Sequence, residues 1–576
     1  MKQQGYTLVP GIGTGYVLWT DTPISFYGGV DSKTGEVIDR HHPLCGQNIK
    51  DKILVIPGGR GSCAGSGGIL ELLHAGCAPA ALVFGQPEVL VTLGVLVSRA
   101  MFNKSIPVLV LGTSLFSDLQ YHSHASISEN NVTFGDAALC LSLEPYAHFP
   151  PTSITLSPND KDILDGKKGE AKKQAMEIIM LYSQAQGADG LIDVSQAHID
   201  ACVYVGPTSL LIPQRLLALG AEVAVPTTMN SLNVDRRRWK ELGCEPILSN
   251  AASEVGDIYM KIGAKESFTC APYLLGTAPG PGDQIGWAES NAVVYANSVL
   301  GARTQKYPDY LDVMIAITGR APNANCHTDS GRVPTLRIDF PELDEFDDSL
   351  YPLLGYFVGQ RVGAEIPLII GLNNITPLPG IPELKAFSAA FATTSAAPMF
   401  HMKGVTPEAH KHEHLLSELK PVPITFSDLR ACWEKLNTHV DSSVALTSLG
   451  NPHFALDEFA ALAKLTRGRK RSPVTQMIIT TSREVYERAA EAGYIASLEA
   501  FGATFITDTC WCLIEEPVIP LGSKNLMTNS AKYAHYGPGT TKRGIHFGSL
   551  AACVDATECG YNKQGTPTWL RGDSPP

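Results

Sequence analysis

Short apolar runs that end in glycine or proline recur along roughly the first 135 residues of the chain. The runs "KILVI" (52–56), "AALVF" (80–84) and "IPVLVL" (106–111) have the length and composition of buried strands. Between the first two, "GGILELLHAG" has helical spacing and ends at Gly76, a residue typical of a helix C-terminus. Strands alternating with a helix predict a small α/β unit at the N-terminus.

The composition then changes to a stretch rich in proline and serine. We expect residues 141–156 to be a linker between a small domain, 1–140, and a large domain, 157–576. The hydrophobic pattern of 160–187 predicts one long amphipathic helix. Strand-like runs then appear at 222–228, 310–319, 365–372, 476–482 and 503–510. Many end in small or polar residues, where open α/β sheets place ligands, so the large domain is expected to carry the site.

Composition supports a two-domain α/β protein and narrows its partners. A chain of 576 residues exceeds the size at which one core keeps growing. The formal charge of −12 argues against nucleic acid or an anionic membrane as partner. The N-terminus lacks a signal-peptide pattern, and Gln86, Pro87 and Glu88 interrupt the best membrane candidate, 78–98. With thirteen cysteines and no CxxC pair, we expect a cytoplasmic protein with free thiols.

The stretch "PGGRGSCAGSGG" (57–68) is the densest glycine cluster behind a predicted strand. It is neither a dinucleotide fingerprint nor a phosphate-binding Walker loop, because the required spacing and lysine are missing. What remains is a nest of backbone N–H groups around Ser62. Such a nest could stabilise a serine alkoxide or hold a substrate carboxylate, and the residues alone leave both roles open.

Several polar clusters interrupt apolar segments further along. They contain His198 and Asp200, Asn230, Cys270 with Glu289 and Ser290, Asn451 with His453, and Cys510 with Ser530 and Lys532. Each has a plain structural alternative. A cysteine is more often a small buried hydrophobic residue than a metal ligand. A histidine in the core can have its ring hydrogen-bonded by backbone groups. Asn529 or Ser530 could have no role beyond capping a helix.

Long segments of the chain resemble the aconitase X family, a remote branch of the aconitase superfamily. Residues 23–68 resemble its small, swivelling part, and "TCAPY…GART" (269–304), "GVTPEA" (404–409) and "TDTC…MTNSAKYAHY" (507–536) resemble its large part. The resemblance implies a small swivelling β-rich α/β domain followed by a large multi-layer α/β aconitase-like domain. It also implies a hydro-lyase, and single-chain members of the family dehydrate cis-3-hydroxy-L-proline to Δ1-pyrroline-2-carboxylate.

The resemblance also implies residue roles. The serine of the family's GRGS loop matches Ser62 and is the proton acceptor there. Cluster-binding cysteines match Cys270 and Cys510, whereas a third family cysteine is replaced by Asn451 in "LGNPH". This departure favours a 2Fe-2S iron-sulfur cluster or a mononuclear iron over a 4Fe-4S cluster, with Asn451 as a candidate ligand. The substrate-binding positions that carry over are Ala201, Cys202, Val203, Asn230, Glu289, Ser290, Ser530, Ala531 and Lys532.

The reaction makes physical sense of these parts. Neutral serine is a poor base, so its alkoxide must be held by N–H dipoles in a dry site. Lys532 suits a substrate carboxylate, and Glu289 suits an imino nitrogen. We therefore expect a small hydroxy-acid substrate. For the oligomeric state, we expect a monomer or a homodimer. Two alternatives stay open, a phosphomevalonate dehydratase and a non-catalytic iron-responsive RNA-binding protein.

Overall fold

The computed structural model describes residues 5–61, 64–135, 139–145, 154–341, 343 and 345–571. Its N-terminal part is one nine-stranded sheet in the order β8-β7-β6-β2-β3-β4-β5-β1-β9. The strands are β1 (Gly5–Val9), β2 (Ile12–Trp19), β3 (Ile53–Ile56), β4 (Ala81–Phe84), β5 (Val108–Leu111), β6 (His124–Ser128), β7 (Asn131–Phe134), β8 (Leu139–Ser142) and β9 (Glu144–Pro145). Strands β2 to β5 pair in parallel, and antiparallel strands flank them. The three strands expected from the apolar runs are thus confirmed.

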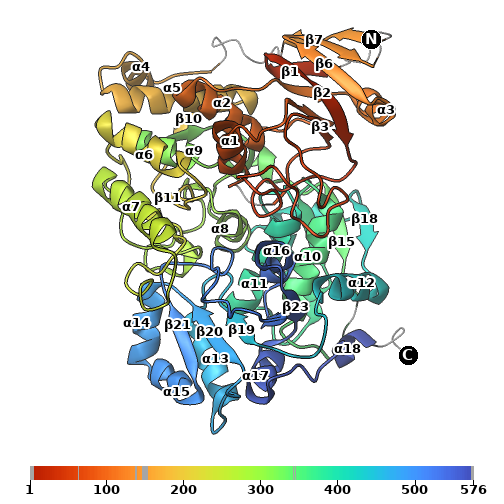
Figure 1. Ribbon diagram of the computed structural model, residues 1–576, viewed down its shortest axis with the longest axis vertical. Helices are drawn as coiled ribbons and strands as arrows, with labels where there is room; N and C mark the ends of the chain where they lie inside the picture. The colour runs from red at the N-terminus through yellow and green to blue at the C-terminus, as the bar shows by residue number, and fades with distance from the viewer. Residues whose placement is uncertain are drawn as a thin grey trace.

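Helices α1 (Gly65–Ala75) and α2 (Leu90–Phe102) pack together beside this sheet, and α3 (Thr113–Asp118) lies near its outer end (Figure 1). Helix α1 ends at Gly76 in the left-handed conformation (φ 69°), as its sequence predicts. The glycine loop leads directly into the buried N-terminus of this helix.

The rest of the chain builds three further parallel sheets. They are ordered β12-β11-β13, β17-β16-β15-β18 and β21-β20-β19-β22-β23, and a short antiparallel pair joins β10 to β14. The strands are β10 (Leu191–Asp193), β11 (Ala197–Ile199), β12 (Thr227–Met229), β13 (Gly286–Trp287), β14 (Arg320–Pro322), β15 (Leu336–Asp339), β16 (Pro367–Ile370), β17 (His401–Met402), β18 (Lys420–Pro423), β19 (Leu446–Leu449), β20 (Gln476–Thr480), β21 (Ala503–Ile506), β22 (Asn525–Thr528) and β23 (Gly544–Phe547). The expected class, a β-rich small domain followed by a larger layered α/β part, is therefore confirmed.

Helices cover these sheets (Figure 1). They are α4 (Pro158–Leu164), α5 (Glu170–Ala185), α6 (Thr208–Ala218), α7 (Pro246–Ile262), α8 (Ser290–Tyr295), α9 (Leu311–Thr318), α10 (Leu350–Val362), α11 (Ile381–Thr394), α12 (Phe426–Leu436), α13 (Leu456–Thr466), α14 (Arg483–Glu491), α15 (Tyr494–Phe501), α16 (Ala531–Thr541), α17 (Leu550–Cys559) and α18 (Thr568–Arg571). Within the described part of the chain, none of the helices is both long and apolar enough to span a bilayer.

Two predictions of local structure are wrong. The expected single helix over 160–187 is divided into α4 and α5, because Gly166 and Gly169 adopt positive φ angles of 79° and 100° between them. The run 310–319, expected as a strand, is the helix α9, whose eight residues are all buried. A helix that is buried on every side has no solvent-facing polar stripe, so its mostly apolar sequence resembles that of a buried strand.

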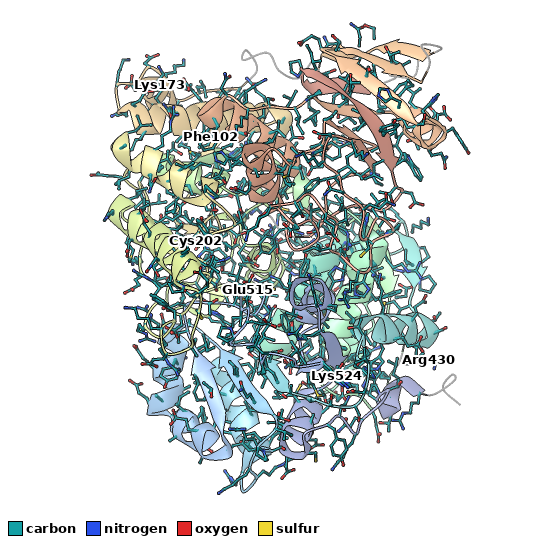
Figure 2. All side chains as sticks on the ribbon, in the orientation of Figure 1. Phe102, Lys173, Cys202, Arg430, Glu515 and Lys524 are labelled. Carbon is teal, nitrogen blue, oxygen red and sulfur yellow. The ribbon has the colours of Figure 1, made fainter. Side chains whose placement is uncertain are left out.

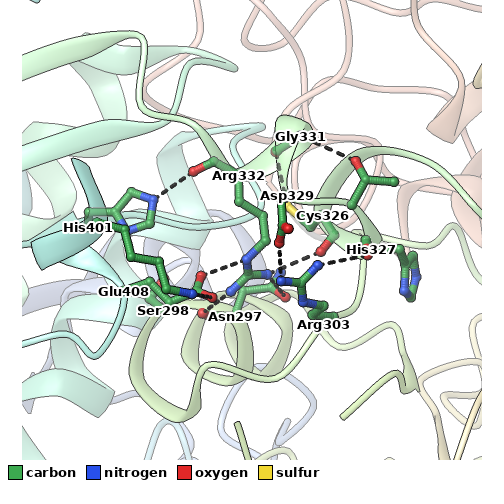
Figure 3. A network of polar contacts seen from close by, with 12 residues as sticks. Asn297, Ser298, Arg303, Cys326, His327, Asp329, Gly331, Arg332, His401 and Glu408 are labelled. Atoms are coloured by element: carbon green, nitrogen blue, oxygen red, sulfur yellow. Dashed lines mark hydrogen bonds and ion pairs between the residues drawn. The ribbon is translucent and has the colours of Figure 1, made fainter. Parts of the chain in front are cut away.

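A buried arginine joins the segment before β15 to residues both earlier and later in the chain (Figure 3). The Arg332 guanidinium forms an ion pair with Glu408 (2.7 Å) and donates to the carbonyl oxygens of Asn297 and Cys326. The His401 ring in turn bonds the Arg332 carbonyl at 2.7 Å. Because the guanidinium donors are satisfied in a fixed planar arrangement, this network sets how two layers of the large part sit against each other.

Candidate active site

Three loops that carry predicted site residues leave the same edge of one parallel sheet. Asn451 follows β19, Cys510 follows β21, and Lys532 lies in the first turn of α16 after β22. The carboxyl ends of parallel strands meet at one edge of a sheet, which is where open α/β sheets bind ligands. The topology therefore brings together residues that are far apart in the sequence.

Cysteine sulfurs gather at this edge. Cys270 Sγ lies 3.8 Å from Cys510 Sγ, although 240 positions separate the two residues. Asn451 Nδ2 contacts Cys510 Sγ at 3.4 Å and Cys512 Sγ at 3.0 Å, and the His453 backbone N–H donates to Cys270 Sγ at 3.3 Å. Cys512 was not predicted as a site residue, although its position two residues after Cys510 could have indicated it.

The thiols influence one another's protonation. Burial alone raises the pKa of Cys270, but a hydrogen bond from Cys510 and the nearby His453 outweigh burial and lower the pKa to about 5. The pKa of Cys512 is lowered as well, chiefly by its hydrogen bond with Cys510. The pKa of Cys510 rises well above its ordinary value, because its proton serves both neighbours. Three thiols whose pKa values shift one another in this way form a site suited to thiolate chemistry.

The donor set fits an iron centre. Thiolate sulfur is a ligand that iron-sulfur clusters and soft metals prefer, and Asn451 Oδ1 is a buried oxygen without a hydrogen-bond partner. Among the described residues, no three His, Cys, Asp or Glu side chains already have the geometry of a completed metal site. Cys270 Sγ and Cys510 Sγ, 3.8 Å apart, are close enough to bind one metal ion together.

A buried ion pair lies next to the thiols. Lys532 Nζ is 3.1 Å from Glu289 Oε1, and both side chains are at most 10% exposed. Burial alone raises the pKa of Glu289, but the Lys532 ammonium and a hydrogen bond from Asn291 outweigh it and lower the pKa to about 2. Burial by itself would lower the pKa of Lys532, yet the Glu289 carboxylate and the cysteines raise it well above its usual range. Both groups are therefore charged at neutral pH.

Two asparagines connect this ion pair to its surroundings. Asn291 Nδ2 donates to Glu289 Oε1 at 2.6 Å and to the Cys270 carbonyl at 2.9 Å, so it links the carboxylate to the thiol loop. Asn230 Nδ2 donates to Glu289 Oε2 at 3.1 Å and also to Asp200. Glu289 therefore accepts hydrogen bonds at both oxygens and is held in one orientation.

The other predicted substrate-binding positions surround this pair. Ser530 caps α16 by accepting from the Tyr533 N–H at 3.2 Å, and Ala531 opens that helix. Ser290 opens α8 beside Glu289. Cys202 is fully buried, at mid-height in the left half of the view in Figure 2, and its thiol donates to the Asn230 carbonyl at 3.2 Å. Ala201 is buried and Val203 half-buried in the same loop.

The small domain reaches this site from the other side. Ser62 lies outside the described residues, but Gly61 just before it (φ 82°) packs so closely against α16 that a Cβ there would lie 2.7 Å from the Tyr536 hydroxyl oxygen. Gly28 packs against the ring of the same tyrosine, where a Cβ would come within 3.0 Å. Tyr536 lies one helical turn beyond Lys532. The glycine loop is thus docked on the helix that carries the lysine.

Tyr27 is a second residue that the sequence did not reveal. It precedes Gly28 in the docked loop, and its carbonyl accepts from Ser25 Oγ at 2.7 Å. Burial first, and then the charge of Cys512, raise the pKa of its phenol, while Lys532 opposes the rise. The small domain therefore contributes a half-buried hydroxyl next to the thiols and the ion pair.

A cavity of about 440 Å³ adjoins the glycine loop. Its lining includes Gly58, Gly61, Glu88, Lys306 and Lys435, and none of the predicted thiol or ion-pair residues is among them. The cavity therefore lies between residues of the small and large parts, and neither the thiols nor the ion pair line it.

The fold and this site define a two-part enzyme in which a small α/β domain covers a buried site of thiols and paired charges. Residues 2–134 match the family Aconitase X swivel domain, and 153–330, 334–434 and 444–558 match the Aconitase X first, second and third domains. The chain belongs to the aconitase X family, and the class of enzyme is a hydro-lyase.

Three relatives illustrate the similarity. A cis-3-hydroxy-L-proline dehydratase of Hypocrea jecorina is 46% identical, over 98% of this chain and 97% of the relative. A phosphomevalonate dehydratase large subunit of Methanothermobacter thermautotrophicus is 33% identical, over 67% of this chain and 94% of the relative. The crystal structure of Thermococcus kodakaraensis aconitase X in its holo-form superimposes with a TM-score of 0.63 at 29% identity, over 70% of this chain and 100% of that chain.

Proposed function

We propose that this enzyme removes water from cis-3-hydroxy-L-proline to form Δ1-pyrroline-2-carboxylate. One observation carries the choice of substrate, the buried pair of Lys532 with Glu289. Among the substrate- and metal-binding positions that carry over from the family and that the structure describes, Lys532 is the only cationic side chain and Glu289 the only acidic one. One ammonium and one carboxylate complement a zwitterionic amino acid, whereas a phosphorylated hydroxy acid carries several negative charges. The 46% identical relative with this named activity supports the same choice.

The two charged side chains would orient the substrate. Lys532 binds the substrate carboxylate, and Glu289 accepts from the protonated ring nitrogen. Because Asn291 and Asn230 hold both Glu289 oxygens, the ring nitrogen is presented in one direction. Substrate charges would thus replace the internal ion pair, which keeps the site electrically balanced before and after binding.

Ser62 would take the proton from the substrate α-carbon. The electron pair of that C–H bond forms the C2=C3 double bond as the C3–O bond breaks and hydroxide leaves. The hydroxide becomes water with the proton that Ser62 has accepted, which regenerates the alkoxide. The resulting enamine moves one proton from nitrogen to carbon to give the Δ1 product. The backbone N–H groups of the glycine loop stabilise the serine alkoxide in a water-poor site, and Tyr27 closes that site from the small domain.

The residues that would hold an iron centre are Cys270, Cys510 and Asn451, with Cys512 beside them. When bound, iron supplies Lewis acidity toward the departing hydroxyl oxygen. With two of these three positions being thiols, we propose a 2Fe-2S cluster or a mononuclear iron in preference to a 4Fe-4S cluster.

The test is a substrate comparison with iron-loaded enzyme. Cis-3-hydroxy-L-proline should be consumed and yield an adduct with o-aminobenzaldehyde, while 5-phosphomevalonate should not be dehydrated. Ser62→Ala should abolish turnover but leave the iron content unchanged. Turnover of 5-phosphomevalonate alone would refute the proposal.

A further inference from the structure

We infer that Asp200 is a protonated carboxyl group that positions Glu289, and that it holds its proton between Glu289 and Asp309. The inference rests on the proposed function, because it assigns a role within the same substrate site. Asp200 is a positioning residue here, and it acts on the substrate through Glu289.

The contacts of these carboxyl groups require a proton. Asp200, Glu289 and Asp309 are 2%, 5% and 6% exposed, so all three carboxyl groups are shielded from bulk water. Asn230 Nδ2 donates both to Asp200 and to Glu289 Oε2 (3.1 Å), so these two carboxyl groups lie side by side, and the carboxyl group of Asp309 is a close neighbour of Asp200. An ionised carboxylate only accepts hydrogen bonds, so two carboxyl groups can bond each other only when one is protonated. Apart from these contacts, no N–H or O–H group donates to Asp200 Oδ2 or Asp309 Oδ1 among the described residues.

The remaining partners of Asp200 leave the proton on this residue. Its other oxygen accepts from Asn230 Nδ2, and its backbone N–H donates to Asp312 Oδ2 at 2.5 Å. Glu289 already accepts from Lys532, Asn291 and Asn230, which favours its ionised form. Asp200 is thus the donor of the group and Glu289 the acceptor.

The surrounding charges favour the same arrangement. The titratable groups around Asp200 are the carboxyls of Glu289, Asp309 and Asp312, the thiol of Cys202 and the phenol of Tyr27, and the ammonium of Lys532 is paired with Glu289. His198, two residues earlier, is neutral, because burial lowers its pKa to about 3. Burial and the three carboxyls together raise the pKa of Asp200 well above its ordinary value. A second anion next to Glu289 would also repel the substrate carboxylate, which Lys532 alone has to attract.

The shared proton lies where the small domain docks. Asp309 Oδ2 faces Gly67 in α1, where an added Cβ would lie 3.1 Å away. The residue after Asp309, Tyr310, has a positive φ of 73°, a conformation that non-glycine residues rarely adopt. The arrangement therefore links the docked helix, through Asp309 and Asp200, to the carboxylate that would bind the substrate nitrogen.

Matched substitutions separate a protonated carboxyl from an ionised one. Asp200→Asn keeps one acceptor and one donor in the same places, so kcat/KM should stay within about threefold of the wild type. Asp200→Leu removes both and should raise KM at least about tenfold, with a smaller effect on kcat. Asp312→Asn is the contrast, because Asp312 accepts from the backbone N–H groups of Asp200, Ala201 and Val313 and cannot be replaced by a group with N–H donors. It should therefore impair the enzyme more than Asp200→Asn does.

Infrared spectroscopy tests the proton without turnover. The wild-type enzyme at neutral pH should show a carboxylic C=O band that disappears in Asp200→Asn and persists in Asp193→Asn, an exposed control. The inference is overturned if Asp200→Asn is as inactive as Asp200→Leu. It is also overturned if Asp200→Asn retains every carboxylic C=O band of the wild type. If Asp200→Leu has wild-type KM, the positioning role is overturned. A wild-type enzyme inactive on cis-3-hydroxy-L-proline would reject the proposed function alone, because the infrared result remains interpretable.

Discussion

Replacing Lys532 by methionine removes the ammonium of the buried ion pair and keeps a side chain of similar length. The chain contains a matched control, because Lys524 forms an ion pair with Asp441 at the same distance of 3.1 Å. The two pairs differ in burial, with lysine side chains that are 10% and 68% exposed. A difference in unfolding free energy between Lys532→Met and Lys524→Met therefore measures how well the Lys532 site is shielded from water.

The expected magnitudes follow from that difference. Removing one partner of a buried pair leaves a buried charge uncompensated and costs about 3–5 kcal/mol of stability. An exposed pair contributes about 0–1 kcal/mol, so Lys524→Met should be nearly neutral. Asn291 and Asn230 still donate to Glu289 in the variant, which places the expected loss for Lys532→Met at the lower end, about 3 kcal/mol. A charged hydrogen bond to the substrate carboxylate is worth about 1.5–3 kcal/mol, so kcat/KM should fall roughly 10- to 150-fold.

Urea denaturation of both variants, followed with the same probe, measures the stability difference, and initial rates with cis-3-hydroxy-L-proline measure the binding difference. A third variant, Lys532→Met with Glu289→Gln, removes both charges and should recover part of the lost stability, although it stays inactive. If Lys532→Met destabilises the protein no more than Lys524→Met, the Lys532–Glu289 pair is not shielded from water. The argument that the charge pair selects a zwitterion would then fail.

Three further outcomes follow from individual contacts. Gly61→Ala should reduce activity strongly, since its Cβ would meet the Tyr536 hydroxyl, whereas Gly46→Ala, with a similar positive φ and open space around it, should cost only backbone strain; wild-type rates for both would contradict the docked loop. Cys512→Ser should lower the iron bound per chain, measured by metal analysis and absorption, and unchanged iron content would show that Asn451 and the other two thiols suffice. Burial raises the pKa of Glu88 to about 7 from an ordinary 4.5, so its contribution to stability is complete below about pH 4.5 and is lost as pH rises to 7. Denaturation at pH 5 and pH 8 should show a loss of up to about 3 kcal/mol from this residue that Glu88→Gln removes.

The local elements that the sequence predicted correctly are those whose pattern is decided by neighbouring residues. Strands β3, β4 and β5 are short apolar runs closed by glycine or proline, and α1 ends at Gly76 because a left-handed residue is needed there. The run that became α9 failed, because a fully buried helix and a fully buried strand are both continuously apolar. The two glycines at the break, Gly166 and Gly169, are present in the sequence, but the amphipathic pattern on either side of them favoured one continuous helix.

The sequence by itself determined the residue types of the site and the family that carries them, since the glycine loop, Cys270, Cys510 and Lys532 all lie in distinctive motifs. Only the tertiary structure decided which of them meet. Cys512 beside Asn451, Asn291 between Glu289 and the Cys270 loop, and Tyr27 from the small domain have no local pattern that announces them. Their roles arise because parallel strands deliver distant loops to one sheet edge and a second domain closes over it, and long-range contacts of that kind leave no periodic trace in the chain.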